Sequence, residues 1–283
     1  MRSHGWYNLA PFSYDREGAV LRTFVEGRAP DPAPHPGPLP GGERGKSHEV
    51  TFRVRGGKLE ARADGIDAPR LRAIARRAFS LDLDFADAAR SFAAEPALVA
   101  ALQGRGARIL RAPTIFEDAV KMLFTTNCSW AATQGMVTRL IGLAGPDGRA
   151  FPSPESVARL SVATIGKRVR CGYRAQALRD FAKRVASGKL DLSRWEGGTL
   201  SSEDLRAAIV SERGFGPYAA EGLIRILGRH DFYALDSWTR QEYRRRYPGP
   251  ARATDRSVAR RYARFGAHRG LAFWLEMTDD WHE

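Results

Sequence analysis

Residues 214–217, Gly-Phe-Gly-Pro, have the residue types of a turn that can hold a phosphate group. Glycine tolerates positive φ angles and lets another group approach the backbone closely. Pro217 suits the first position of a helix, whose free N–H groups and dipole favour an anion. Phe215 would insert into the core and fix the turn. The alternative is an ordinary turn between two helices, which often contains glycine.

An aspartate, Asp236, follows Gly216 by 20 residues and precedes a helical pattern. Aspartate is a common N-cap residue, because its carboxylate accepts a hydrogen bond from the first helical turn, and capping alone explains it here. Beside a phosphate-binding turn, the carboxylate has a second use. It could lie next to a deoxyribose held by the turn and stabilise the oxocarbenium-like sugar that forms as a base leaves.

The charge of the chain favours a polyanionic partner. Its 283 residues include 45 Lys and Arg against 32 Asp and Glu, a net charge of +13. Between residues 240 and 264, nine arginines stand against two acidic residues. A solvated helix face usually alternates in sign, so we expect this stretch, and Arg244 and Arg245 within it, to contact the DNA backbone. Only six of the basic residues are Lys, and such a bias can also reflect genomic base composition.

Composition excludes several classes of protein. Hydrophobic residues make up 43% of the chain and charged residues 27%, as in a globular protein. No apolar run approaches the roughly 18 residues of a membrane span, and the start lacks the apolar core of a signal peptide. We therefore expect no membrane contact and a cytoplasmic, nucleoid-associated location. Cys128 and Cys171 are too few for a disulfide scaffold or a four-cysteine metal site.

The first part of the chain has the pattern of an antiparallel sheet. Apolar and polar residues alternate over 50–54 and again over 59–63, and Gly56-Gly57 between them suits a primed hairpin turn. The stretch 28–48 carries six prolines at alternating positions, followed by glycines, which prevents regular structure. We expect an N-terminal β-rich domain over residues 1–67, interrupted by a disordered surface insertion over 28–48.

From Pro69 onward the apolar spacing is helical, which predicts an all-helical body over 68–283 and an α+β fold. Thr114 and Glu117 have the spacing of a capping box at the start of one helix. Pro154 suits the first position of another helix. Further helices are predicted over 174–186, 202–212, 217–227, 236–247, 254–265 and 269–277.

With these motifs the sequence resembles the helix-hairpin-helix (HhH-GPD) DNA glycosylases, the enzymes of base excision repair. The hairpin at 213–228 and the aspartate region at 234–240 carry most of the resemblance. Gly172-Tyr173-Arg174-Ala175 is similar to a turn of the branch that contains 8-oxoguanine DNA glycosylase and 3-methyladenine DNA glycosylase II. Other similar stretches extend over nearly the whole chain: His4-Gly5-Trp6-Tyr7, the hairpin at Gly56, Phe116-Glu117-Asp118, Thr125-Thr126-Asn127 and Gly135-Met136-Val137.

The resemblance implies roles for single residues. Asp236 would be the catalytic carboxylate. Asn127 would be the wedge that fills the gap left by a flipped nucleotide, although an Asn in a turn between helices is an equally good reading. Gly214, Gly216 and Ala219 would offer backbone N–H groups to a DNA phosphate. A monovalent cation, Na⁺ or K⁺, could bind at the backbone of the two glycines.

The sequence departs from part of the family. Bifunctional members carry a hairpin Lys that attacks the sugar as an amine nucleophile. Tyr218 stands there, and no Lys follows Lys189. An aromatic residue at this position of the hairpin is a feature that the sequence shares with the monofunctional members. Tyr218 and Trp238 are therefore expected to line a base pocket. Members with an iron–sulfur cluster have four Cys near the C-terminus, and none follows Cys171, so we expect no cluster and no other cofactor.

Other aromatic residues have two readings. Trp130, Tyr173, Trp238 and Trp274 could supply further stacking surfaces. Aromatic residues at helical spacing are usually core residues, and we favour this reading for each of the four.

We therefore expect a monomeric, monofunctional DNA glycosylase that acts on double-stranded DNA. It would flip out an alkylated or oxidised purine and hydrolyse the N-glycosidic bond, leaving an abasic site. The alternative is a catalytically silent DNA-binding protein that retains the fold. A third hypothesis, lyase chemistry from another amine such as the N-terminus, is less favoured.

Overall fold

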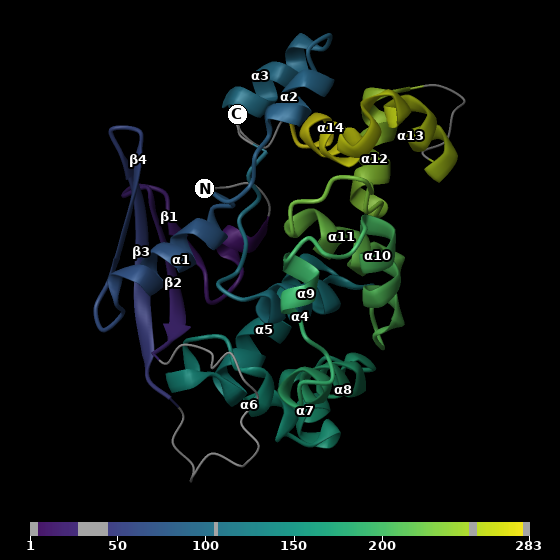
Figure 1. The fold of residues 1–283 in the computed structure, drawn as a ribbon. Helices are drawn as coiled ribbons and strands as arrows, with labels where there is room; N and C mark the ends of the chain where they lie inside the picture. The colour runs from purple at the N-terminus through teal and green to yellow at the C-terminus, as the bar shows by residue number, and fades with distance from the viewer. Residues whose placement is uncertain (1–4, 28–44, 105–106, 249–253, 280–283) are drawn as a thin grey trace.

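The computed structural model describes residues 5–27, 45–104, 107–248 and 254–279 (Figure 1). Its only sheet in these ranges has four antiparallel strands in the order β1-β2-β3-β4. Their bounds are Ser13–Asp15, Val20–Glu26, Ser47–Arg55 and Lys58–Ala63. Gly56 and Gly57 have φ angles of 54° and 74°, which confirms the predicted primed turn. Val50 and Phe52 are fully buried, whereas Val54, close to the turn, is 54% exposed.

The predicted insertion at 28–48 lies mostly outside the described residues. Its C-terminal boundary is wrong, because Ser47 and His48 are part of β3. Their backbones pair with Glu26 and Val25 of β2, and this pairing fixes both residues in the sheet.

Except for the short helix η1, the described helices follow the sheet in sequence. The 3-10 helices are η1 Gly5–Asn8, η2 Pro146–Gly148 and η3 Ala263–His268. The first α-helices are α1 Ala68–Ala78, α2 Ala86–Ser91, α3 Pro96–Gly104, α4 Ile115–Thr125, α5 Trp130–Ala144, α6 Pro154–Ala158 and α7 Val162–Val169. The remaining ones are α8 Arg174–Ala186, α9 Ser193–Glu196, α10 Ser202–Ser211, α11 Pro217–Ile226, α12 Ser237–Arg246, α13 Asp255–Tyr262 and α14 Arg269–Met277. The predicted bounds of α8 and α14 are confirmed, whereas the helix predicted over 254–265 continues beyond Tyr262 as η3.

Helix α4 begins where the sequence predicts, but only half of the capping box is present. The Thr114 hydroxyl accepts a hydrogen bond from the backbone N–H of Glu117 at 3.2 Å. The Glu117 carboxylate instead pairs with Lys121 Nζ at 2.6 Å, and both side chains are buried. Burial raises the pKa of Glu117. This carboxylate therefore belongs to the core and does not cap the helix.

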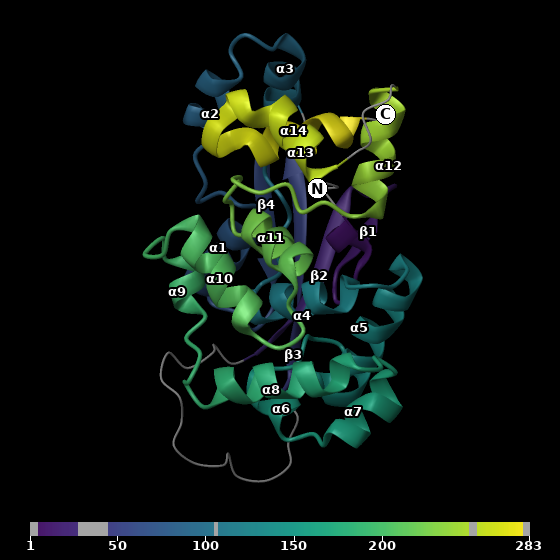
Figure 2. The same ribbon diagram turned by 90° about the vertical axis from the view of Figure 1, so that its right-hand side faces the viewer.

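Two hydrophobic clusters hold the described residues together. The larger one joins the sheet to the central helices, with Phe52 of β3 and Phe116 of α4 among its members. The smaller one includes Phe92, which follows α2, and Tyr262 and Phe273 of α13 and α14. In both views α2, α3 and α12–α14 lie at one end of the molecule and α6–α8 at the other, with α10 and α11 side by side between them (Figures 1 and 2). Among the described residues, no helix combines the length and apolar character that crossing a bilayer demands.

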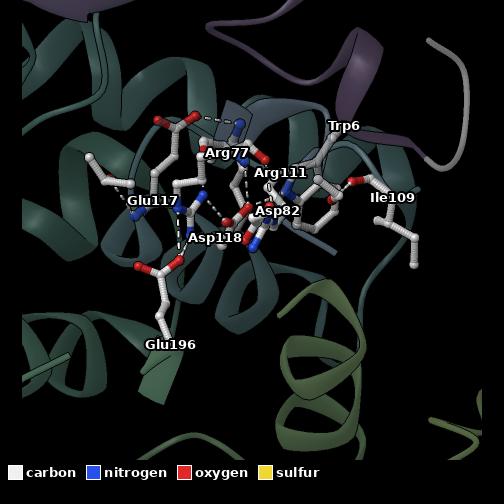
Figure 3. Close-up of polar contacts among 12 residues, drawn as sticks. Trp6, Arg77, Asp82, Ile109, Arg111, Glu117, Asp118 and Glu196 are labelled. Carbon is white, nitrogen blue, oxygen red and sulfur yellow. Dashed lines mark hydrogen bonds and ion pairs between the residues drawn. The ribbon is translucent and has the colours of Figure 1, made fainter. Parts of the chain in front are cut away.

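A buried polar cluster anchors α4 to the start of the chain (Figure 3). The carboxylate of Asp118 accepts hydrogen bonds from Trp6 Nε1 at 2.8 Å and from Ala112 N at 2.9 Å. It also pairs with Arg77 Nη1 at 2.9 Å, and Arg77 pairs with Glu196 at 2.7 Å. Burial opposes the charge of Arg77, but Asp118 and Glu196 outweigh it and raise the pKa of Arg77. The cluster fixes α4, whose C-terminal end contributes to the candidate site.

Candidate active site

The turn between α10 and α11 is held in place by packing at Gly214 and Phe215. Gly214 has a φ of 89°, and an added Cβ would lie 2.7 Å from the Ala177 Cβ and 2.9 Å from Leu123 Cδ1. Phe215 is 2% exposed, and its ring centre is 5.2 Å from that of Phe181. The expectation that Phe215 inserts into the core is confirmed. A side chain at position 214 would collide with the adjoining helices.

Gly216 is the N-cap of α11 and leaves the start of this helix bare. No side chain caps it, and a Cβ added at Gly216 would meet nothing within 4 Å. Pro217 has no N–H, and the N–H groups of Tyr218 and Ala219 have no intrahelical partner. An anion that approached over Gly216 would meet these two donors and the positive end of the helix dipole.

Asp236 is the N-cap of α12 and uses only one carboxylate oxygen for this purpose. Its Oδ1 accepts hydrogen bonds from Thr239 N at 2.7 Å and Thr239 Oγ1 at 2.8 Å. Its backbone N–H donates in return to Thr239 Oγ1 at 2.9 Å, which completes a capping box. The other oxygen, Oδ2, faces the hydroxyl group of Tyr218 at 3.5 Å. The capping role therefore leaves one oxygen of the carboxylate available to a ligand.

Tyr218 joins three helices at this point. Burial and the neighbouring Asp236 carboxylate raise the pKa of Tyr218, so the phenol remains protonated and donates to the carboxylate. Thr125, the last residue of α4, lies close enough to Tyr218 to act on the same pKa, which it lowers. The hairpin helix, the aspartate of α12 and the end of α4 thus meet around one half-buried ring.

Two exposed polar side chains, Asn127 and Tyr173, meet beside the turn after α4. Asn127 has a φ of 45°, and its Nδ2 donates to the hydroxyl of Tyr173 at 3.4 Å. The buried Arg174 supports both, since its Nε donates to Thr126 Oγ1 at 3.1 Å and its guanidinium lies 4.6 Å from the centre of the Tyr173 ring. Hydrogen bonds with Thr126 and Asn127 lower the pKa of Tyr173.

Several aromatic residues depart from their expected place in the core. Tyr173 is 63% exposed, because it precedes α8 and lies off the core-facing stripe of that helix. Trp130 is 37% exposed and stacks on Trp6 with ring centres 6.4 Å apart. Trp274 is half-buried beneath Arg225. The expectation of core burial is wrong for Tyr173 and Trp130.

Some of the site residues predicted from the sequence lie near one another. Asp236 and Tyr218 are in contact, Thr125 lies close to Tyr218, and Asn127, two residues after Thr125, contacts Tyr173. Ala219 is buried, so only its backbone can meet a ligand, and the prediction concerns its backbone N–H group. Trp238 is half-buried against the smaller hydrophobic cluster.

The positive charge of the basic stretch at 240–264 is neutralised by ion pairs to a greater extent than its sequence indicates. Several of its arginines form ion pairs of 2.5–2.8 Å: Arg240–Asp255, Arg245–Glu242, Arg246–Glu242 and Arg264–Glu95. Arg244 is exposed and has no hydrogen bond or ion pair with the described residues. Of the two arginines predicted to contact the DNA backbone, Arg244 is free to do so and Arg245 would have to leave Glu242.

Comparison with known proteins identifies the fold. No family model and no curated protein matches the sequence. Its structure is similar to that of MBOgg1 in complex with a low-affinity DNA ligand, with a TM-score of 0.67, 22% identity and coverage of 96% of this chain and 99% of the other. It is also similar to Clostridium acetobutylicum 8-oxoguanine glycosylase/lyase bound to double-stranded DNA, with a TM-score of 0.68, 16% identity and coverage of 99% and 93%. The 3-methyladenine DNA glycosylase from Archaeoglobus fulgidus gives a TM-score of 0.69, 18% identity and coverage of 99% and 93%.

The chain has the helix-hairpin-helix DNA glycosylase fold. The alignments cover nearly the full length of both partners, so the sheet and the helices both belong to this fold. The fold that the resemblance of the sequence implies is confirmed. Within this glycosylase fold, α10 and α11 are the two helices of the hairpin, and Asp236 begins the next helix along the chain.

Proposed function

We propose that the protein is a monofunctional DNA glycosylase, which hydrolyses the N-glycosidic bond of a damaged base in double-stranded DNA. The observation that carries this proposal is the position of Asp236. Its Oδ1 is occupied by the helix cap, while Oδ2 faces Tyr218 on the hairpin helix, 3.5 Å away. A carboxylate oxygen is thereby held beside a bare helix start that suits a phosphate.

In the proposed reaction the hairpin binds the DNA backbone through the N–H groups of Gly216, Tyr218 and Ala219. The deoxyribose then lies near Asp236, whose negative charge stabilises the positive charge that develops on the sugar as the C1′–N bond breaks. The base leaves with the electron pair of this bond. A water oxygen bonds to C1′, one water proton is released, and an abasic site remains.

Tyr218 supports the hydrolytic mechanism over a lyase mechanism. A Schiff base with the sugar needs a primary amine, which a phenol cannot replace. Lys121, one turn before Thr125 on α4, is buried and paired with Glu117 at 2.6 Å. The side chains that surround Asp236 thus include no free amine among the described residues.

Asn127 and Tyr173 are suited to fill the gap left by a flipped nucleotide. Both are exposed, and both are held by the buried Arg174 through the Thr126 contact and the stacked ring. A rigid polar wedge of this kind lowers the cost of unstacking a base, which is a few kcal/mol. We propose Asn127 as the wedge residue, with Tyr173 beside it.

Two further parts of the proposal concern ligands and assembly. The carbonyl of Gly214 accepts no backbone hydrogen bond from the described residues, while that of Gly216 accepts one from Ala220 N at 3.0 Å. A monovalent cation would bind at these two carbonyls and add positive charge near the phosphate. We also propose that the protein acts as a monomer and that it is cytoplasmic.

The experiment that tests the function uses a panel of duplexes, each with a single alkylated or oxidised base. The protein is incubated with each duplex, and alkali then converts abasic sites into strand breaks. We expect breaks only after alkali, on at least one duplex. Binding to the duplexes without base release on any of them would favour the catalytically silent DNA-binding protein.

A further inference from the structure

Arg225 places a buried positive charge close to the candidate site. It follows Tyr218 by about two turns on α11 and is 8% exposed. Side chains on a helix lean toward its N-terminus, so the guanidinium is directed back toward Tyr218. Burial lowers the pKa of Arg225, and the nearby Tyr218 and Asp236 oppose this shift. The positive charge of Arg225 therefore acts on the same part of the site as the negative charge of Asp236, the proposed catalytic carboxylate.

The described residues give this cation few partners. Its Nη2 donates to the carbonyl of Tyr233 at 3.1 Å, and its guanidinium lies 4.4 Å from the ring centre of Trp274. Its Nε is buried and has no hydrogen-bond partner within the described part of the chain. Glu221, one turn earlier, pairs instead with Arg206 at 3.0 Å and accepts from Ala234 N at 3.1 Å.

A buried guanidinium without a carboxylate in contact is destabilising, so packing alone does not account for Arg225. One hydrogen bond to the Tyr233 carbonyl could be made by a neutral donor. The nearby Trp274 ring favours the positive charge but accepts no conventional hydrogen bond, so the N–H groups that Tyr233 does not bind can donate to another acceptor. His230, another neighbour, is uncharged, because burial and the charge of Arg225 lower its pKa to about 3.

We propose that Arg225 determines the class of base that the enzyme accepts, an inference that rests on the proposed glycosylase function. Arg225 would donate hydrogen bonds to the carbonyl edge of a neutral base, as arginine does to the acceptors of guanine. It would repel a base that carries a formal positive charge, because charges interact strongly where water is excluded. Oxidised and deaminated bases are neutral and rich in carbonyl groups, whereas purines alkylated at N3 or N7 are cationic. The substrate is then a neutral, carbonyl-bearing lesion.

The test compares duplexes that differ in a single base: 8-oxoguanine, hypoxanthine or uracil as neutral lesions, and 7-methylguanine as the cationic one. Single-turnover base release is measured for the wild type, Arg225→Gln and Arg225→Lys. We expect the wild type to release at least one neutral lesion faster than 7-methylguanine. Arg225→Gln should shift this ratio toward 7-methylguanine on the order of tenfold or more, while Arg225→Lys, which keeps the charge, should shift it much less.

A duplex with a tetrahydrofuran abasic analogue separates this role from a structural one. The analogue has no base at the lesion position, so all three proteins should bind it with equal affinity. Arg225→Gln should unfold at no lower temperature than the wild type, because it removes a buried charge. An unchanged ratio in Arg225→Gln would overturn the inference. Faster release of 7-methylguanine than of every neutral lesion by the wild type would do so without any variant, and would leave the glycosylase function intact. Release of no base at all would overturn the proposed function, and this inference with it.

Discussion

Two alanine substitutions in the hairpin, Gly214→Ala and Gly216→Ala, should have opposite consequences. At position 214 the backbone has a φ of 89°, and the new Cβ would lie 2.7 Å from the Ala177 Cβ and 2.9 Å from Leu123 Cδ1. Strain at positive φ and overpacking each cost about 1–3 kcal/mol, so we expect a loss of about 2–6 kcal/mol in the free energy of unfolding. For a domain of this size, that lowers the melting temperature by roughly 4–24 °C.

At position 216 the same substitution leaves the fold intact. The φ angle of Gly216 is −80°, and an added Cβ meets nothing within 4 Å. Alanine is a slightly poorer N-cap than glycine, which limits the loss of stability to about 1 kcal/mol. The methyl group would instead occupy the space through which a phosphate reaches the N–H groups of Tyr218 and Ala219. Losing one charge-assisted hydrogen bond weakens binding by roughly ten- to a hundredfold.

The assay combines thermal unfolding with binding to an abasic-analogue duplex, for both variants and the wild type. We expect Gly216→Ala to lower the melting temperature by no more than about 4 °C and to bind all duplexes more weakly. Gly214→Ala should show a clear drop in melting temperature, which serves as the control for damage to the fold. Wild-type affinity in Gly216→Ala would refute the role of the hairpin as a phosphate-binding turn and return it to an ordinary turn between helices.

Three further outcomes follow from single residues. Borohydride should trap no adduct between the wild type and DNA, whereas Tyr218→Lys should yield one; a trapped wild-type adduct would show that another amine acts as a nucleophile. Arg244→Ala should lower the slope of log affinity against log salt by about 0.9, and Arg245→Ala by less because that residue is paired with Glu242 at 2.7 Å; equal slopes in all three proteins would assign these arginines to a solvated face. The pKa of His230 is lowered to about 3 from an ordinary 6.5, so the unfolded chain takes up a proton first as the pH falls, and stability present above pH 6.5 is lost below it. Urea unfolding at pH 7 and pH 5 should show an extra loss of about 2 kcal/mol that His230→Asn removes, and an identical loss in the variant would contradict this reasoning.

The hairpin and Asp236 could be predicted from the sequence because their signals are local. Gly214, Phe215 and Gly216 specify a turn through residues next to one another, and Asp236 caps a helix through Thr239, three residues away. The primed turn at Gly56-Gly57 is predictable for the same reason. In each case the physical cause lies within a few residues of its effect.

The exposed Tyr173 and the compensated arginines could not be predicted in this way. Tyr173 is held by Arg174, whose own partner, Thr126, is 48 residues away in the sequence. Arg264 pairs with Glu95 across 169 residues. Their environments depend on how the helices pack, which the apolar pattern of each helix does not specify.

Arg225 shows the same limit more sharply. Its spacing of four residues from Glu221 predicts an ion pair along one face of α11. Tertiary packing gives Glu221 a different partner, Arg206, at 3.0 Å. Arg225 is thereby left buried against Trp274, 49 positions further along the chain, without a carboxylate in contact. The buried Arg225 that we propose to set specificity thus results from tertiary packing, which overrides the local preference for an ion pair with Glu221.

The most direct test of the proposed chemistry is single-turnover base release by Asp236→Asn. The duplex is the one from which the wild type releases the base fastest. Asparagine caps a helix about as well as aspartate, so the variant should keep the melting temperature and the affinity for an abasic-analogue duplex. Without the charge of Oδ2 beside the sugar, the rate of release should fall on the order of 10² or more. Release at the wild-type rate would show that Asp236 is only the cap of α12, and that the carboxylate takes no part in breaking the glycosidic bond.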